Sequence, residues 1–144
     1  MYKNHLAGIE VRNGAKLVAS KNRIFDSGYH GVLIGPEAGE CYIDGNKIFE
    51  NAREEILALL NKTRIVVQNN DIHHNRPFGI SVDSNSQLVV VKNKIFENGF
   101  WGIFAKTRTS PHIAENVISG KKCGGILIGV NYSGRIQMQS NVVR

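Results

Sequence analysis

Two adjacent histidines, His73 and His74, are the residues of this chain whose types most directly suggest chemistry. Neighbouring imidazoles on a turn could bind a metal ion or act as a general base. The spacing favours a structural role, because His73 falls at a position that Phe25, Phe49 and Phe96 occupy at intervals of 23 or 24 residues. We therefore expect His73 to replace a packed aromatic ring, His74 to lie at an exposed turn, and no metal to bind.

The carboxylates are too scattered for sugar chemistry. Asp83 has no acidic neighbour among the equivalent positions of adjacent repeats, and Glu10 lies three repeats away, about 14 Å at 4.8 Å per rung. A glycosidase needs two carboxyl groups about 5 to 9.5 Å apart, and a divalent cation needs several converging oxygens. We expect no catalytic residues and no cofactor, with a polysaccharide lyase or hydrolase as the enzymatic alternative.

Composition indicates one domain with enough apolar residues for a core: 144 residues, 42% hydrophobic, net charge +6 and pI near 9.5. No apolar run approaches the roughly 20 residues that cross a bilayer, so no membrane association is expected.

The positive charge permits an acidic partner, but acidic residues interrupt the basic ones, so nucleic acid is not expected to bind. Cys41 and Cys123 lack metal-ligand spacing and lie too far apart for an internal disulfide, which favours a cytoplasmic or nuclear location.

These residues are positioned by a repeat that runs through the whole chain. Its clearest copy is Asn93-Lys94-Ile95-Phe96-Glu97-Asn98, and the first asparagine recurs at spacings of 24, 24, 23, 23 and 25 residues. The six lead asparagines are Asn22, Asn46, Asn70, Asn93, Asn116 and Asn141. A fixed period of this length indicates a solenoid.

Each repeat contains short alternating segments rich in β-branched residues, which predict strands. A glycine followed by a β-branched residue opens one segment in most repeats, so that coils start near residues 8, 31, 55, 79, 102 and 125. The pattern predicts an all-β fold: a right-handed, single-stranded parallel β-helix of about six coils of 23–24 residues, forming one domain over residues 1–144. A leucine-rich repeat is the alternative, and only residues 52–60 have the helical propensity that it requires.

The recurring asparagines have a physical explanation in such a stack. Asparagine tolerates the left-handed backbone of a tight turn, and its amide can donate to the equivalent residue of the next coil. We therefore predict that the lead asparagines form a ladder. A second column, Asn51, Asn75 and Asn98 with Ser27 and Lys121 in register, is expected to mark an exposed turn.

The repeat Asn-x-Ile-Phe-x-Asn, followed by Gly-Ile or Gly-Val, resembles the parallel β-helix repeat of the pectate-lyase-like superfamily. The segments at residues 21–26 and 31–34 are most similar to its eukaryotic branch, which includes the β-helical domains of F-box-only protein eleven and of the Shc SH2-domain-binding proteins. The resemblance implies a β-helix over nearly the whole chain. In F-box proteins such a domain is thought to recognise substrates, but this chain has no F-box, zinc-finger or SH2-binding segment, so the resemblance carries the fold and not that cellular role.

The surface expected to bind a partner lies before and along the Gly-Ile segments. Aromatic residues fill the preceding turn and apolar residues project outward from the segment itself. The predicted partner-binding residues are Tyr29, His30, Leu33, Leu57, Phe78, Phe100, Trp101, Phe104 and Leu127. A contiguous apolar strip on a solenoid indicates a protein or peptide partner, or a covering segment of a longer chain.

The sequence thus predicts a non-catalytic protein-interaction scaffold, such as the substrate-recognition part of a larger ubiquitin-ligase-like or signalling protein. The alternative is a carbohydrate-binding or carbohydrate-modifying β-helix that stacks sugars on the same aromatics. The chain starts partway through a coil and has no capping helix, so we expect a fragment of a longer solenoid or end-to-end self-association through unpaired strand edges.

Overall fold

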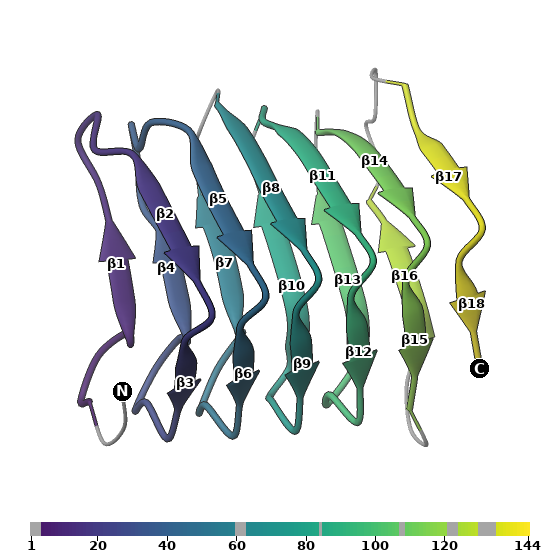
Figure 1. Ribbon diagram of the computed structural model, residues 1–144, viewed down its shortest axis with the longest axis horizontal. Coiled ribbons are helices and arrows are strands. Elements are labelled where there is room, and N and C mark those ends of the chain that lie inside the picture. Colours follow the sequence, from purple (N-terminus) through teal and green to yellow (C-terminus); the bar gives the residue numbers. More distant parts are fainter. Residues whose placement is uncertain (1–3, 60–62, 84, 107–108, 121–123, 130–134) are drawn as a thin grey trace.

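The computed structural model describes residues 4–59, 63–83, 85–106, 109–120, 124–129 and 135–144. Within these ranges the chain forms eighteen strands and no helix (Figure 1). The strands make three six-stranded sheets in which every pairing is parallel. This confirms the predicted β-helix, and the absence of helix in the described ranges excludes the leucine-rich alternative. Residues 56–59, within the segment of helical propensity, form a strand.

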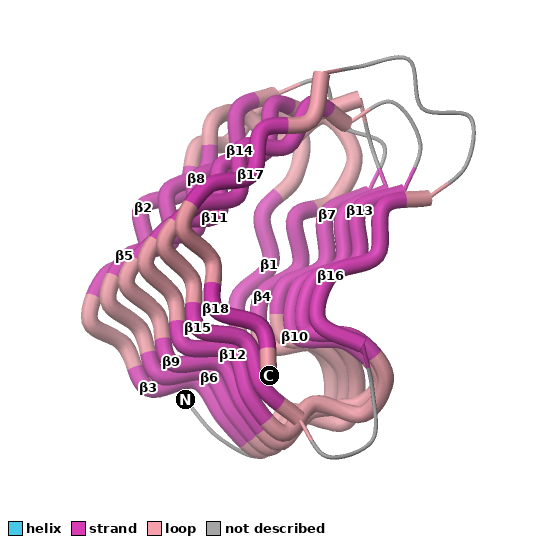
Figure 2. The backbone as a smooth tube through the Cα atoms, turned by 90° about the vertical axis from the view of Figure 1, so that its right-hand side faces the viewer, coloured by secondary structure: helices cyan, strands magenta, loops and turns pink. Residues whose placement is uncertain are grey.

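The three sheets run side by side along the solenoid, and each coil contributes one strand to each sheet (Figure 2). The first sheet has the order β1 (Ile9–Val11), β4 (Val32–Ile34), β7 (Ile56–Leu59), β10 (Phe78–Asp83), β13 (Trp101–Lys106) and β16 (Gly124–Ile128). The second has the order β17 (Gln137–Gln139), β14 (Ser110–Ala114), β11 (Gln87–Val91), β8 (Arg64–Gln68), β5 (Cys41–Asp44) and β2 (Leu17–Ser20). The third has the order β18 (Val142–Val143), β15 (Val117–Ser119), β12 (Lys94–Phe96), β9 (Asp71–His73), β6 (Lys47–Phe49) and β3 (Arg23–Phe25).

The core is a set of columns in which each coil places an apolar residue directly above its equivalent in the previous coil. In the first sheet the inward column is Ile9, Val32, Ile56, Ile80, Ile103 and Ile126. The central members of this column are fully buried, as are Ile24, Ile48, Ile72 and Ile95 of the third sheet. Since six strands of a sheet are separated by five full turns, the fold has about five complete turns, slightly fewer than the six coils predicted.

The left-handed turn residue is not the lead asparagine, contrary to our expectation. It is the residue immediately before it: Lys21 (φ 55°), Gly45 (φ 66°), Asn69 (φ 55°), Lys92 (φ 55°), Glu115 (φ 55°) and Ser140 (φ 54°). This geometry turns the chain one residue early and directs the asparagine side chain inward, where it can hydrogen-bond along the stack.

The lead asparagines form the predicted ladder. The Oδ1 atom of Asn70 accepts from the backbone N–H of Asn46 at 2.8 Å and from its Nδ2 at 3.0 Å. Asn93 accepts in the same way from Asn70, at 2.9 and 3.0 Å. The pattern extends from Asn22 to Asn141. Each amide therefore satisfies a buried backbone donor of the neighbouring coil, which an apolar residue could not do.

The second asparagine column was wrongly predicted to be exposed. Asn51 and Asn75 are 4% and 1% exposed, and the Oδ1 of each accepts from the backbone N–H of the equivalent residue one coil earlier, at 2.9 and 3.1 Å. Asn98 continues this second ladder. A left-handed residue precedes each member here too, so the same turn geometry buries both columns. Lys121, placed in this column by sequence, lies outside the described residues.

Glu55 replaces glycine at the start of the third coil, and its side chain is completely buried. Both of its carboxylate oxygens lie 2.9 Å from the Nδ2 of Asn51, so the carboxyl group fills space beside the second ladder. Burial raises the pKa of Glu55 well above its usual value, although the hydrogen bonds from Asn51 oppose this shift.

Cys41 is buried without a disulfide, and Cys123 lies outside the described residues. None of the described segments is a helix long and apolar enough to cross a membrane.

Candidate binding surface and turn cleft

The outer face of the first sheet carries a column of apolar side chains. Leu33, Leu57, Phe104 and Leu127 are in register on successive strands, with Ser81 between the second and third of them. The four apolar side chains are all half-buried. Alternation along a strand requires this exposure, because the neighbouring residues of each strand point into the core.

Two aromatic residues at the starts of β10 and β13 widen this column. The rings of Phe78 and Phe104 stack with centroids 5.0 Å apart. Trp101 pairs with Phe78 on one side and with Gly124 on the other, and its indole lies where a Cβ atom at position 124 would be. We call Leu33, Leu57, Phe78, Trp101, Phe104 and Leu127 the apolar strip. The structure thus brings together six of the nine residues predicted to bind a partner.

The other three predicted residues lie in the turn that precedes the first sheet. Tyr29 is 43% exposed and its ring lies 4.7 Å from the guanidinium carbon of Arg53 on the next coil. His30 is only 7% exposed, with its Nδ1 atom 3.2 Å from Glu54. His30 occupies the column of Phe78, and its low exposure leaves little of its ring available to a partner. Its part in partner binding remains a prediction.

Phe100 is the most exposed aromatic side chain of the described residues, at 63%. It forms one wall of an open cleft of about 660 Å³, which lies between the turns at residues 74–77 and 97–100. We call this the turn cleft; it is lined by His74, Asn75, Arg76, Pro77, Glu97, Asn98, Gly99 and Phe100. The ring of Phe100 lies 6.4 Å from that of Phe78, so the cleft adjoins the apolar strip.

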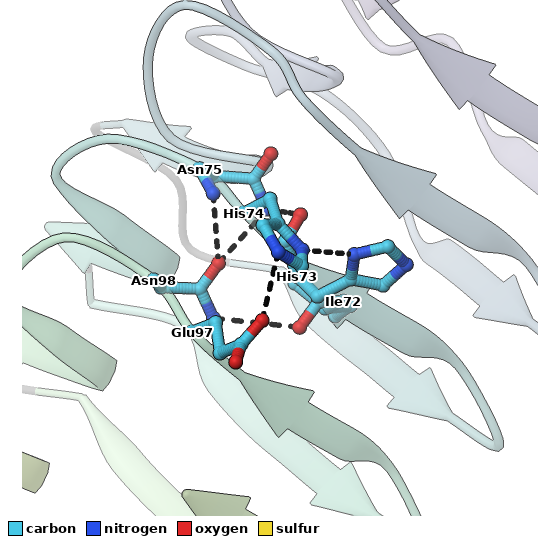
Figure 3. A network of polar contacts seen from close by, with 6 residues as sticks. All are labelled: Ile72, His73, His74, Asn75, Glu97 and Asn98. Atoms are coloured by element: carbon cyan, nitrogen blue, oxygen red, sulfur yellow. Dashed lines mark hydrogen bonds and ion pairs between the residues drawn. The ribbon is translucent and has the colours of Figure 1, made fainter. Parts of the chain in front are cut away.

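A polar network joins four of the residues that line the cleft, His74, Asn75, Glu97 and Asn98 (Figure 3). His74 Nε2 lies 2.7 Å from the carboxylate of Glu97, and His74 Nδ1 lies 2.7 Å from Nδ1 of His73. Asn75 donates to the backbone carbonyl of His73 at 2.8 Å and to Oδ1 of Asn98 at 2.9 Å. These bonds tie the two turns together and fix the orientation of both imidazoles.

His73 occupies the aromatic column of the third sheet, as predicted. Its ring stacks between Phe49, at 5.2 Å, and Phe96, at 4.6 Å, while Phe25 stacks on Phe49 at 5.0 Å. Burial lowers the pKa of His73, and the nearby His74 lowers it further. His74 is exposed, as expected for a turn. The neighbouring rings cover both faces of His73, which supports the structural role that the sequence indicated.

The carboxylates on this side of the molecule are paired with cations. Asp83 lies 3.4 Å from Lys106, and Glu10 is bonded to Arg12, which follows the end of β1. Among the residues that the structure describes, no group of three histidine, cysteine or acidic side chains is placed to hold a metal ion. The sequence interpretation did not identify Arg76 or the pairing of His74 with Glu97. The only available signal was that these residues occupy equivalent turns of adjacent coils.

The comparison with known families follows from this architecture. Residues 2–144 match the family described as the right-handed β-helix region. The chain belongs to this family. It is 22% identical over 125 residues to a mannuronan C5-epimerase from Pseudomonas putida, an alignment that covers 85% of this chain and 24% of the epimerase. The chain therefore spans about a quarter of the length of this relative. No solved structure matches it.

Proposed function

We propose that this β-helix is a non-catalytic scaffold that binds an extended segment of a protein partner along the apolar strip. The observation that carries the proposal is the column of half-buried apolar side chains Leu33, Leu57, Phe104 and Leu127, which is interrupted at Ser81 on β10, with the Phe78 ring stacked on Phe104. Apolar surfaces of this kind on solenoids are typical of partner recognition. Aromatic residues are also enriched in interface cores.

The charges around the strip support binding over catalysis. Asp83 and Lys106 lie at its edge and neutralise each other across adjacent strands. A hydrolytic pair of carboxylates would need a second acid beside Asp83, and the register places Leu59 and Lys106 there instead. A non-catalytic role is therefore the proposal most compatible with this face.

The test is selection of short random peptides displayed on phage. We expect the wild-type chain to enrich binding sequences, and the double variant Trp101→Ala/Phe104→Ala to lose them while unfolding at a similar temperature. The matched control is Val18→Ala/Tyr42→Ala, which removes a registered apolar pair from the outer face of the second sheet. Equal binding by the strip variant and the wild type would refute the proposed surface.

A second candidate function is binding or modification of an acidic polysaccharide. It is favoured by the similarity to a mannuronan C5-epimerase and by the net charge of +6. The turn cleft would supply an aromatic ring and a cation to such a ligand. Incubation with mannuronan, with and without calcium, separates the candidates: binding or a change in the polymer would support this second function and displace the first.

A further inference from the structure

Arg76 is a cation without a counterion in the turn cleft. Its side chain is exposed, and among the described residues no carboxylate lies within ion-pairing distance of it. The other ionisable side chains that line the cleft are His74 and Glu97, and the Nε2 atom of His74 lies 2.7 Å from the Glu97 carboxylate. Since the Glu97 carboxylate contacts His74 and not Arg76, the guanidinium of Arg76 is available to an external anion.

The cleft is preorganised by the backbone of two successive coils. Gly99 donates to the carbonyl of Asn75 at 2.8 Å, and Phe100 donates to the carbonyl of Pro77 at 2.6 Å. Asn75 and Asn98 of the second asparagine ladder are also hydrogen-bonded to each other across the same two coils. A site whose walls are fixed in this way loses little conformational entropy when a ligand binds.

We propose that the turn cleft binds the carboxylate of an aspartate or glutamate in the same extended segment that occupies the apolar strip, with Arg76 as its counterion and Phe100 against the neighbouring side chain. This inference rests on the proposed scaffold function and adds the chemistry of the partner to it. Guanidinium and carboxylate can form two parallel hydrogen bonds, so the pair supplies direction as well as affinity.

The apolar strip favours a polypeptide over a sugar polymer as the occupant. The cleft continues into the strip through the contacts of Phe100 with Phe78 and of Phe78 with Phe104. Leucine and phenylalanine side chains match the apolar side chains of a peptide, whereas sugar hydroxyls placed against them would lose hydrogen bonds to water without replacement. The partner is therefore expected to carry an acidic residue beside an apolar or aromatic run.

The experiment uses peptides selected on the wild-type chain as described above. We expect an aspartate or glutamate to be enriched next to apolar residues, and Arg76→Gln to weaken binding of such a peptide about tenfold, equivalent to about 1.4 kcal/mol. Replacing the acidic residue of the peptide by its amide should cause the same loss, and the two changes together no further loss. Arg64→Gln, which removes an exposed arginine from β8, is the matched control and should leave the affinity unchanged.

The outcomes separate this inference from the function on which it rests. Loss of binding in the Trp101/Phe104 variant with no effect of Arg76→Gln would refute the carboxylate site and retain the scaffold. Selection without acidic enrichment would do the same. Failure to enrich any peptide over the strip variant would refute both, and tight binding of mannuronan that requires Arg76 would assign the cleft to a polysaccharide instead.

Discussion

The lead asparagine ladder gives the sharpest prediction about stability, and Asn70 is its best test position because it lies in the middle of the stack and is 1% exposed. Its side chain accepts from the backbone N–H of Asn46 at 2.8 Å and donates to the carbonyl of Ile43 at 2.9 Å. Asn70→Ala leaves both groups buried and without these bonds. Each buried polar group left without a hydrogen bond costs about 1–3 kcal/mol, and local relaxation recovers part of this cost. We therefore expect the free energy of unfolding to fall by about 3 kcal/mol.

Urea unfolding followed by circular dichroism measures this loss directly. A decrease of about 3 kcal/mol corresponds to a fall in Tm of roughly 10 °C for a chain of this size. Asn85→Ala is the control, since Asn85 is an exposed asparagine outside both ladders. A change within about 0.5 kcal/mol for Asn70→Ala would refute the reasoning, because surface substitutions alone produce effects of that size.

Two further substitutions test local features of the coils. Because the pKa of Glu55 is raised in the folded state, the folded chain keeps this proton at pH values where the unfolded chain releases it, and stability should fall as pH rises above the ordinary glutamate range. The Glu55→Gln variant should therefore unfold at a higher temperature than the wild type near pH 8 and at a similar temperature near pH 4. A variant that is less stable than the wild type at both pH values would contradict this reasoning. The Gly45→Ala variant should have a free energy of unfolding in urea about 1–2 kcal/mol lower than the wild type, because φ at this position is 66°. The control is Lys92→Ala at the equivalent turn, where a non-glycine residue already has φ 55°, and its free energy of unfolding should fall much less.

Much of the fold could be predicted because the period forces equivalent residues into columns. The six lead asparagines and the isoleucines two residues after them specify the rungs, and the observed pairings keep this register from β1 to β18. The stacking of His73 between two phenylalanines followed from the same alignment. Each of these features depends only on which residues share a column.

The features that the sequence did not predict concern whether a side chain at a turn points into the core or toward solvent. Asn51 and Asn75 share a column as predicted, but their burial depends on the left-handed residue that precedes each of them, which spacing does not reveal. Glu55 was a departure from glycine in the sequence, and its burial beside Asn51 is a property of packing. His30 shares a column with Phe78 but is only 7% exposed, and the Glu54 carboxylate of the next coil lies 3.2 Å from its Nδ1 atom.

The turn cleft could not be predicted from the repeat spacing either. Arg76 and Phe100 do not occupy equivalent positions of the repeat, and they line the same cleft because it lies between two adjacent turns. Phe100 was included in the predicted binding set for its aromatic character, whereas Arg76 had no pattern to identify it. The repeat period therefore predicts the β-helical fold, whereas surface features formed by residues between the repeats can be identified only from the three-dimensional structure.

The central claim is that a protein segment lies on the apolar strip, and the fluorescence of Trp101 tests it most directly because this is the only tryptophan of the chain. A peptide selected on the wild type should shift its emission to shorter wavelength and protect it from iodide quenching, with a midpoint that matches the calorimetric Kd. A peptide that binds by calorimetry but leaves both the emission and the quenching of Trp101 unchanged would contradict the account.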